Sequence, residues 1–460
     1  MFSPRFVVYI SFFLLTSICC AAFFCGYINS NSFIFLLTFV FLIIIIQYLK
    51  TIDIIPIFIF SFIIRFLCAI LIPTIQTSDF QIMQQAAINV TKGDFSFLNE
   101  QYFLDWAYQI GFVAYQAAVI WLTGSETLAL QLVNITATSF SVIVVYWIGK
   151  RLFSHKAAIT AALIYALYLP PIASSGLLTN QHIATFFFLA SILSLLYFDK
   201  NKFYLIIISG AFAALGNFMR PEGIVLITGA SLYLIGKGII NGNYFRPLLL
   251  TLVLVVSYNI SFETLNYAVN STGVYEGRLA NNNPKWKFVL GLNAETKGYY
   301  STTLAKRVAD AHNIDERDLI QNEIITSHLS NKSELIKLMK DKFILMWTES
   351  DELLWWSFRE TNLDRAFEVF SQIADTQYFL IIALFTVGIV FSYRNTDSYI
   401  LLFILLINAA AYLLIEIQTR YRYFAIPFIV IYSGYGYASL EMWICRLKRK
   451  ISPDSNTPSS

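Results

Sequence analysis

The chain has 460 residues, of which 57% are hydrophobic and only 13% are charged. A water-soluble domain has no interior large enough for that much apolar surface, so the composition indicates a polytopic membrane protein. The net charge of +3 is small and the basic residues are spread over many loops, which argues against a nucleic-acid partner. The five cysteines lie in or beside apolar segments, which argues against an external disulfide framework.

Apolar segments long enough to cross a bilayer as helices, about 17–22 residues each, recur along the chain. In chain order we predict about twelve such spans, with limits of ten and fourteen, near 6–26, 33–49, 54–73, 127–148, 157–173, 181–198, 203–219, 223–240, 247–268, 376–393, 398–416 and 422–442. The apolar segment 109–123 is too short to span, and we expect it to lie in the membrane interface as a helix. The predicted fold class is therefore an all-α polytopic membrane protein.

Orientation follows from the lysines and arginines, which are enriched in cytoplasmic loops. They gather in the short loops on one face, at Arg5, Lys50, 149–156, 199–202, 237–246, Arg394 and 446–450. We therefore predict that both termini are cytoplasmic and that two long loops, 74–126 and 269–375, are external. The expected location is the plasma membrane of a bacterium, with multiple passes through the bilayer.

This pattern divides the chain into five parts. We predict a transmembrane hairpin over 1–53, a core over 54–268 that includes loop 74–126, an external region over 269–375, C-terminal transmembrane helices over 376–442 and a cytoplasmic tail over 443–460. Within the external region, apolar residues recur at three- and four-residue steps between Asp318 and Trp347, which predicts an amphipathic helix on the outer membrane surface.

Several motifs occur in an order that resembles a known family. The stretch "RFLCAILIPTIQTSDF" is followed by "YFLDWAYQIGF", then by "ALGNFMRPEGIVLI", "WKFVLGLNAETKGYYS" and "EIQTRYRYFAIP". This series resembles GT-C glycosyltransferases, and most closely the family 39 group of protein O-mannosyltransferases and lipid A aminoarabinose transferase. The resemblance implies a GT-C architecture with external juxtamembrane helices, and a sugar donor carried on a polyprenyl phosphate.

In that group an acidic residue of the first external loop is the catalytic base, and the matching residue here is Asp79. A sugar on polyprenyl phosphate already has a good leaving group, so the remaining task is to remove a proton from the attacking hydroxyl. The alternative is that Asp79 only caps the following helix. Asp105 in "LDWAYQIG" matches a second acidic residue of GT-C loops, with a solvated loop charge as its alternative. Gln109 of the same motif is a candidate substrate-binding residue.

Arginines at the ends of spans are the candidates for binding the donor phosphate, because a charge at that depth is costly unless it is paired or faces a polar cavity. Arg220 is followed by Glu222, which is either part of the site or a structural partner. Arg420 and Arg422 likewise either bind the phosphate or form a structural ion pair, in which Glu416 of the same motif would be the partner. We expect one of these two to bind phosphate and the other to brace it.

The remaining polar residues are weaker candidates. His182 occupies a position where relatives often carry an acidic residue, although lone histidines are more often structural. Arg65 lies inside a predicted span, where it either pairs with a carboxylate or reaches the interface. The acidic run "ESDE" (349–352) lacks a second ligand cluster, and we interpret it as a solvated surface rather than a cation site. We therefore expect no metal and no cofactor.

We predict a membrane glycosyltransferase that moves a sugar to an acceptor outside the membrane, where a cell-wall polymer, a glycolipid and a protein all remain open. A lipid-linked oligosaccharide flippase or transporter is one alternative, but it should show broken helices in matching halves and short loops on both faces. An O-antigen-type polysaccharide polymerase is another, and it would lack the acidic first loop.

Overall fold

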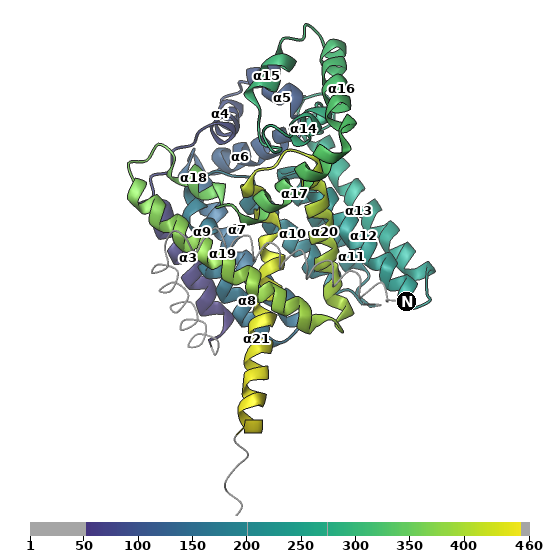
Figure 1. The fold of residues 1–460 in the computed structure, drawn as a ribbon. Helices are drawn as coiled ribbons and strands as arrows, with labels where there is room; N and C mark the ends of the chain where they lie inside the picture. The colour runs from purple at the N-terminus through teal and green to yellow at the C-terminus, as the bar shows by residue number, and fades with distance from the viewer. Residues whose placement is uncertain (1–51, 200, 274, 452–460) are drawn as a thin grey trace, which may run out of the picture.

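The computed structural model describes residues 52–199, 201–273 and 275–451, so the two spans predicted before residue 50 lie outside the described residues. Every regular element of the described chain is a helix (Figure 1). The helices are α3 (Ile54–Leu71), α4 (Asp79–Thr91), η1 (Ser96–Asn99), α5 (Gln101–Asp105), α6 (Gln109–Thr123), α7 (Leu128–Leu152), α8 (His155–Leu167), α9 (Leu169–Ala173), η2 (Ser174–Gly176), α10 (Gln181–Leu196), α11 (Tyr204–Met219), α12 (Gly223–Ile240), α13 (Phe245–Asn270), α14 (Pro284–Gly291), α15 (Thr302–Ala309), α16 (Ile314–Ser330), α17 (Lys332–Thr348), α18 (Glu352–Phe358), α19 (Asp364–Ser392), η3 (Thr396–Ser398), α20 (Tyr399–Leu414), η4 (Thr419–Phe424) and α21 (Ile426–Ile451).

Six of the described helices are long and apolar enough to cross a membrane, and a bent pair, α8 with α9 and η2, makes a seventh if it is one span. Three shorter apolar helices, α6, α10 and α11, accompany them. The all-α polytopic fold class is therefore confirmed. Ten of the predicted spans coincide with a helix or with the bent pair, although α19 starts well before the predicted residue 376.

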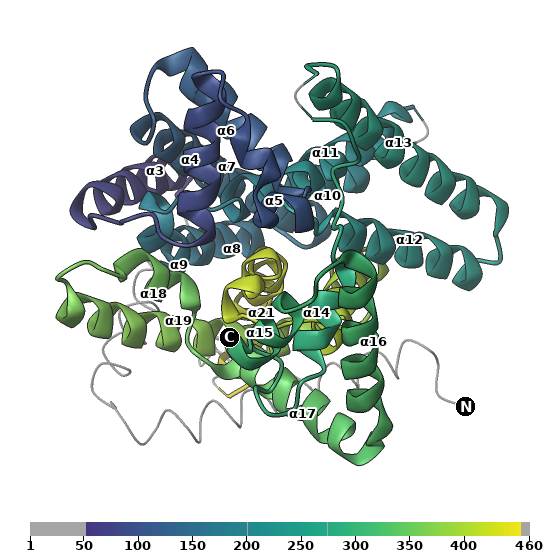
Figure 2. The ribbon, with the colours of Figure 1, turned by 90° about the horizontal axis from the view of Figure 1, so that it is seen from above.

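The long helices form a bundle, and the short helices gather at one end of it, opposite the end where α21 projects (Figure 1). Helices α4 to α6 come from loop 74–126, and helices α14 to α18 come from region 269–375. Figure 2, which looks onto this end, shows both groups lying over the bundle. Two segments far apart in the sequence thus cover the same end, as expected for two loops on one side of a membrane.

Helix α21 packs against α19 and α8. Glycines allow this close approach: a Cβ atom on Gly388 of α19 would lie 2.1 Å from the carbonyl oxygen of Tyr432, and one on Gly436 of α21 would lie 2.1 Å from that of Leu384. Small residues of this kind let helix backbones meet inside a membrane. The packing fixes the position of α21, which continues directly from η4.

The prediction of one continuous amphipathic helix in the external region is wrong. The amphipathic segment from Asp318 to Trp347 is divided between α16 and α17, and the break falls at Asn331. The Asn331 side chain accepts a hydrogen bond from the N–H of Glu334 and so caps the start of α17. Asparagine is among the preferred residues for this position, so the sequence carried a local signal for the break.

The bend between α8 and α9, 49°, comes from two prolines. Pro170 and Pro171 have no N–H groups, so the carbonyls of Ala166 and Leu167, four residues earlier, lose their helical partners. Arg65 of α3 donates to the carbonyl of Ala166 at 3.3 Å and to that of Tyr165 at 3.4 Å. Gln377 of α19 donates to the carbonyl of Leu167 at 2.9 Å.

These contacts show how the charge of Arg65 is accommodated inside the helix bundle. Its side chain is fully buried and bonds to carbonyl groups at a helix break, whereas the sequence predicted a carboxylate partner or a route to the interface. The partial negative charge at the end of α8 offsets part of the cost of burying the guanidinium.

We expect Arg65→Met to lower thermal stability, because the carbonyls of Tyr165 and Ala166 would be left buried without donors. Each unsatisfied acceptor costs about 1–3 kcal/mol. Thermal unfolding of the purified protein in detergent measures this change. Arg394→Met, which removes an exposed arginine from a short loop, serves as the control. Equal melting temperatures for the two variants would contradict the role assigned to Arg65.

Candidate active site

Asp79 is the first residue of α4, at the end of the bundle covered by the short helices. Its carboxylate oxygen Oδ2 lies 3.7 Å from Nη2 of Arg420, and 41% of the Asp79 side chain is exposed. The preceding residue, Ser78, has a φ of 54°, a conformation that costs energy in a non-glycine residue and is often found at functional sites. Asp79 therefore combines access to solvent with a fixed cationic neighbour.

Arg420 lies in η4, and its surroundings hold it firmly. The Gln418 side chain accepts from its Nε at 2.5 Å, and its backbone carbonyl accepts from Gln181 at 2.6 Å. Its guanidinium lies 5.3 Å from the ring centres of both Phe80 and Trp356. Phe80 follows Asp79 on α4 and Trp356 belongs to α18, so three separate segments meet at this arginine.

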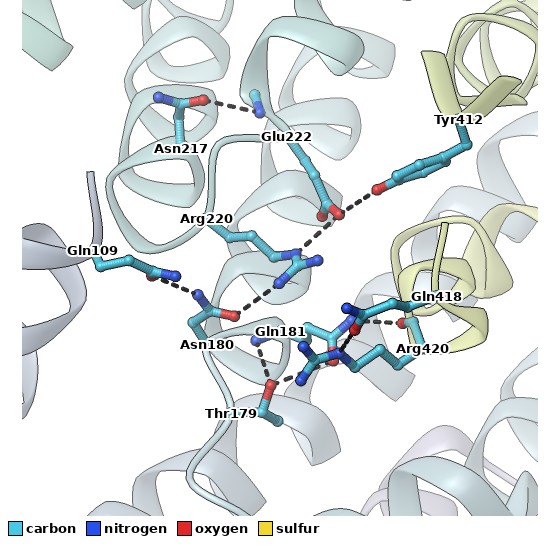
Figure 3. A network of polar contacts seen from close by, with 11 residues as sticks. Gln109, Thr179, Asn180, Gln181, Asn217, Arg220, Glu222, Tyr412, Gln418 and Arg420 are labelled. Atoms are coloured by element: carbon cyan, nitrogen blue, oxygen red, sulfur yellow. Dashed lines mark hydrogen bonds and ion pairs between the residues drawn. The ribbon is translucent and has the colours of Figure 1, made fainter. Parts of the chain in front are cut away.

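A second arginine, Arg220, lies near the ring of Tyr421, as Arg420 does. The guanidinium carbon of Arg220 is 5.1 Å from the centre of the Tyr421 ring, and that of Arg420 is 5.8 Å from it. Arg220 donates to Glu222 at 2.9 Å and to Asn180 at 3.1 Å, as Figure 3 shows. Tyr421 thus joins the two predicted arginines into one site.

The hydrogen bonds around Arg220 extend to α20 on one side and to α6 on the other (Figure 3). Glu222 also accepts from the Tyr412 hydroxyl at 2.9 Å, and Asn180 donates to Gln109 at 3.3 Å. Gln109 and Glu222 are therefore close to Arg220, as expected for residues of one site. Arg220 and Glu222 form an ion pair, and this pair fixes the orientation of the guanidinium.

Glu416 has a different partner from the one predicted. Its carboxylate pairs with Nζ of Lys287 at 2.5 Å and accepts from Gln418 at 3.1 Å, whereas the sequence suggested a pair with Arg420 or Arg422. Burial opposes the charge of Lys287, but the neighbouring Tyr421 and Glu416 outweigh it and hold the pKa of Lys287 above its ordinary value. Lys287 was missed in the sequence, although it lies within the quoted motif "WKFVLGLN".

A buried lysine holds the segment that carries these residues. The ammonium group of Lys342, on α17, donates to the carbonyls of Gly291, Leu413 and Ile415 at 2.7, 2.8 and 2.7 Å. Leu413 and Ile415 lie at the end of α20, just before Glu416. Burial lowers the pKa of Lys342 to about 7, and the Glu416 carboxylate opposes this shift. The lysine thus joins α17, α14 and the start of the site segment.

We expect Lys342→Met to lower the melting temperature and to weaken activity, because three carbonyls that are buried or partly buried would lose their shared donor. The cost is about 1–3 kcal/mol for each acceptor left unsatisfied. Lys340→Met, on an exposed position of the same helix, is the matched control. Differential scanning calorimetry compares the two, and an unchanged melting temperature for Lys342→Met would contradict this role.

The observed partners of Asp105 are residues other than Asp79 and Arg420. Its carboxylate pairs with Nη1 of Arg317 at 2.6 Å and accepts from Asn283 at 3.4 Å. Arg317 belongs to α16, and its side chain is only 15% exposed. The observed contacts of Asp105 join α5 to the external helices.

Arg422 is buried behind the site. It lies 4.5 Å from the ring centre of Tyr378 and 4.0 Å from Asp351, and its Nε donates to the carbonyl of Thr419. These contacts fit the bracing role that we expected for one of the two arginines of η4. Among Arg420 and Arg422, the first is the one beside Asp79.

The acidic run 349–352 is a solvated surface only in its first half, where Glu349 and Ser350 are exposed. Asp351 is buried beside Arg422, and the N–H of Glu352 donates to the Thr419 hydroxyl at 3.0 Å. Burial raises the pKa of Glu352 to about 7, against the opposing charge of Arg420. In the described residues, no group of three or more histidine, cysteine or acidic side chains could hold a metal ion.

His182 is fully buried, with both ring nitrogens in hydrogen bonds. Nδ1 is 2.7 Å from the Tyr423 hydroxyl, and Nε2 is 3.0 Å from the carbonyl of Ser174. These bonds connect α10 to η4 and η2. They are the contacts of a structural histidine that supports the segment carrying Arg420.

Comparison with known proteins agrees with the motifs. A family model described as dolichyl-phosphate-mannose-protein mannosyltransferase matches residues 110–262. No curated protein sequence matches the chain.

Among solved structures, the archaeal oligosaccharyltransferase AglB from Archaeoglobus fulgidus, in complex with an inhibitory peptide and a dolichol-phosphate, matches 90% of this chain and 53% of its own, with 13% identity and a TM-score of 0.50. The apo form of the Archaeoglobus fulgidus oligosaccharyltransferase matches 90% of this chain and 54% of its own, with 12% identity and a TM-score of 0.52. ArnT from Cupriavidus metallidurans bound to undecaprenyl phosphate covers 88% of this chain and 81% of its own, with 10% identity and a TM-score of 0.38. The chain thus spans about half the length of the archaeal oligosaccharyltransferase, whose likeness confirms the predicted fold.

Proposed function

We propose that this chain, which has the GT-C fold of membrane glycosyltransferases, transfers a sugar from a polyprenyl-phosphate donor to a hydroxyl-bearing acceptor outside the membrane. The observation that carries the proposal is the Asp79–Arg420 pair, with Oδ2 and Nη2 3.7 Å apart, beside the second arginine, Arg220. A carboxylate beside Arg420, with Arg220 near the same tyrosine ring as Arg420, provides a proton acceptor and an anion-binding site in one place.

The proposed reaction uses these groups in fixed roles. Asp79 accepts the proton of the acceptor hydroxyl as its oxygen bonds to the anomeric carbon of the sugar. The bond between that carbon and the phosphate oxygen breaks, and its electron pair stays on the polyprenyl phosphate. Arg420 stabilises the negative charge that grows on the phosphate, and it does so more in the transition state than in the ground state.

The other site residues support these two. Arg220, bound to Glu222 and Asn180, supplies a second cationic group whose direction is fixed. Gln109 and Lys287 hold the elements around it, through Asn180 and Glu416 respectively. Asp105 is proposed as a positioning residue, since its contacts join loop 74–126 to α16.

A direct test is to incubate the purified protein with labelled polyprenyl-phosphate sugars and to measure the release of polyprenyl phosphate. We expect release together with transfer of label to a hydroxyl acceptor. A flippase is the competing function, because the broken span α8–α9 is a feature that transporters also show. Movement of intact donor across a vesicle membrane, without release of polyprenyl phosphate from any donor, would favour the flippase.

The proposed orientation, with both termini cytoplasmic, predicts that a cysteine placed at the exposed Lys332 reacts from outside the cell. The reason is that Lys332 starts α17, at the end of the bundle where the candidate site lies. Labelling of intact cells with an impermeant thiol reagent, in a variant that lacks the native cysteines, measures this. A cysteine at 332 that reacts only after the cells are opened would overturn the orientation.

A further inference from the structure

A cavity of about 600 Å³ lies at the end of the bundle opposite the candidate active site. Ile206, in the first turn of α11, lines this cavity, while Arg220 follows the last residue of the same helix. Ile206 and Arg220 are 14 positions apart, so at 1.5 Å per residue α11 separates the two places by about 21 Å. The cavity is therefore distinct from the site around Asp79, and its volume is in the range of small-ligand pockets.

The cavity has an apolar wall and a polar rim. The apolar residues come from the ends of α10, α12 and α13 and from α11 and α20, and the polar ones come from the loops and helix ends around them. The wall includes Leu195, Phe198, Ile206, Leu234, Leu250 and Ile400. The rim includes Arg151, Asp199, Tyr233, Lys237, Asn241, Asn243, Arg246 and Asp397.

The two carboxylates of the rim already have partners. Asp397 pairs with Nζ of Lys237 at 2.6 Å. Asp199 accepts from the N–H groups of Asn201 and Lys202 at 2.8 and 3.0 Å, and its other oxygen lies 3.5 Å from Nζ of Lys202. Nearby ammonium and N–H groups thus compensate the negative charge of both carboxylates. The net charge of the rim therefore depends on the other cationic side chains.

Those remaining cations are Arg151 and Arg246. In the part of the chain that the structure describes, neither forms an ion pair, although the positive charge of Arg151 attracts the Asp397 carboxylate at longer range. Arg151 donates its Nε to the carbonyl of Leu196 at 3.0 Å, which fixes the direction of its guanidinium at the rim. Two arginines without carboxylate partners at the mouth of an apolar-walled cavity favour an anionic ligand with an apolar part.

The surroundings indicate where such a ligand would come from. The cavity lies on the basic face that the positive-inside pattern assigns to the cytoplasm, where the lipid leaflet is anionic. Next to it, α12 and α13 expose Ile239, Leu248, Leu249 and Leu252, as expected for helices that face lipid. Acyl chains could therefore lie along these helices while a headgroup enters the rim.

We propose that this cavity binds the phosphodiester headgroup of an anionic membrane lipid, held by Arg151 and Arg246. Basic pockets between transmembrane helices on the cytoplasmic side are suited to such headgroups. The proposal goes beyond glycosyl transfer and does not depend on it, because it uses none of the residues of the candidate active site.

Native mass spectrometry of the purified protein, loaded with either phosphatidylglycerol or phosphatidylcholine, tests the proposal. We expect retention of phosphatidylglycerol but not of phosphatidylcholine, and loss of about tenfold or more in affinity for phosphatidylglycerol in the double variant R151Q/R246Q. R151K/R246K, which keeps both charges, should lose less. The control is Arg394→Gln, which removes an exposed arginine outside the cavity lining.

Equal retention of the two lipids, or equal retention of phosphatidylglycerol by wild type and R151Q/R246Q, would overturn the proposal. Binding of inorganic phosphate as tight as that of the lipid would also overturn it, because the occupant would then be a free anion. If R151Q/R246Q fails to fold, the comparison of R151K/R246K with Arg394→Gln decides, since the bidentate geometry is lost while the charge is kept.

Discussion

Asp79→Asn should lower turnover by about 10²–10⁴-fold, because the change keeps the shape of the side chain and removes the proton acceptor. Binding of the donor and thermal stability should change little, since the Asp79 side chain is 41% exposed and its contact with Arg420 is a long one, at 3.7 Å. Transfer of a labelled sugar, measured together with donor binding on the same preparation, separates the two effects.

Two carboxylates of the same loop serve as controls. Asp94→Asn should retain activity, because Asp94 is exposed and its carboxylate accepts from the neighbouring Ser96 rather than from a residue of the candidate site. Asp105→Asn should weaken the pair with Arg317 and so lower stability more than Asp79→Asn does. Full activity in Asp79→Asn together with none in a folded Asp105→Asn would assign the base to Asp105 instead.

Arg420→Lys should lower turnover by about 10²-fold and donor affinity by less. Lysine keeps the positive charge and loses the planar fork that matches two phosphate oxygens, and the loss matters most when charge grows on the leaving phosphate. Arg420→Ala should weaken both donor binding and turnover. Equilibrium binding of the donor and single-turnover transfer, measured separately, distinguish these outcomes.

Arg359→Lys is the matched control, because Arg359 also lies over tryptophan rings, at 4.9 Å from Trp355, but contacts neither Asp79 nor Arg420 in the interactions observed. The same pair of changes at Arg220 tests the second arginine, whose partners Glu222 and Asn180 hold it in place. If alanine at both Arg220 and Arg420 leaves binding and turnover intact, the phosphate is bound elsewhere and Arg422 becomes the next candidate.

Much of the fold could be predicted from local patterns. A span is a continuous run of apolar residues, so the ends of α7, α12 and α20 are visible in the sequence within a few residues. Charged residues in apolar surroundings were equally visible, and this is why Arg220 and Arg420 could be selected before the structure was known. The break at Asn331 was also local, and it was missed because the apolar periodicity continues on both sides of it.

The partners of the charged residues were not predictable in this way. Lys287 and Glu416 are 129 positions apart, and Arg317 and Asp105 are 212 apart. Their pairing depends on how region 269–375 folds against the segment after α20 and against loop 74–126. Periodicity reports which face of a helix is apolar, and it contains no information about which distant helix lies against that face. The contact of Arg65 with the broken end of α8 belongs to the same class.

The sequence by itself therefore determined the membrane class, most helix positions and the candidate ionisable residues, because burial in lipid selects residue types locally and strongly. Only the tertiary structure decided that Asp79 meets Arg420, that Arg420 and Arg220 both lie near the ring of Tyr421, and that Asp105 is paired with Arg317. The physical reason is that a buried charge must find a partner, while the identity of that partner depends on which segments the packing of the whole chain brings within a few ångströms.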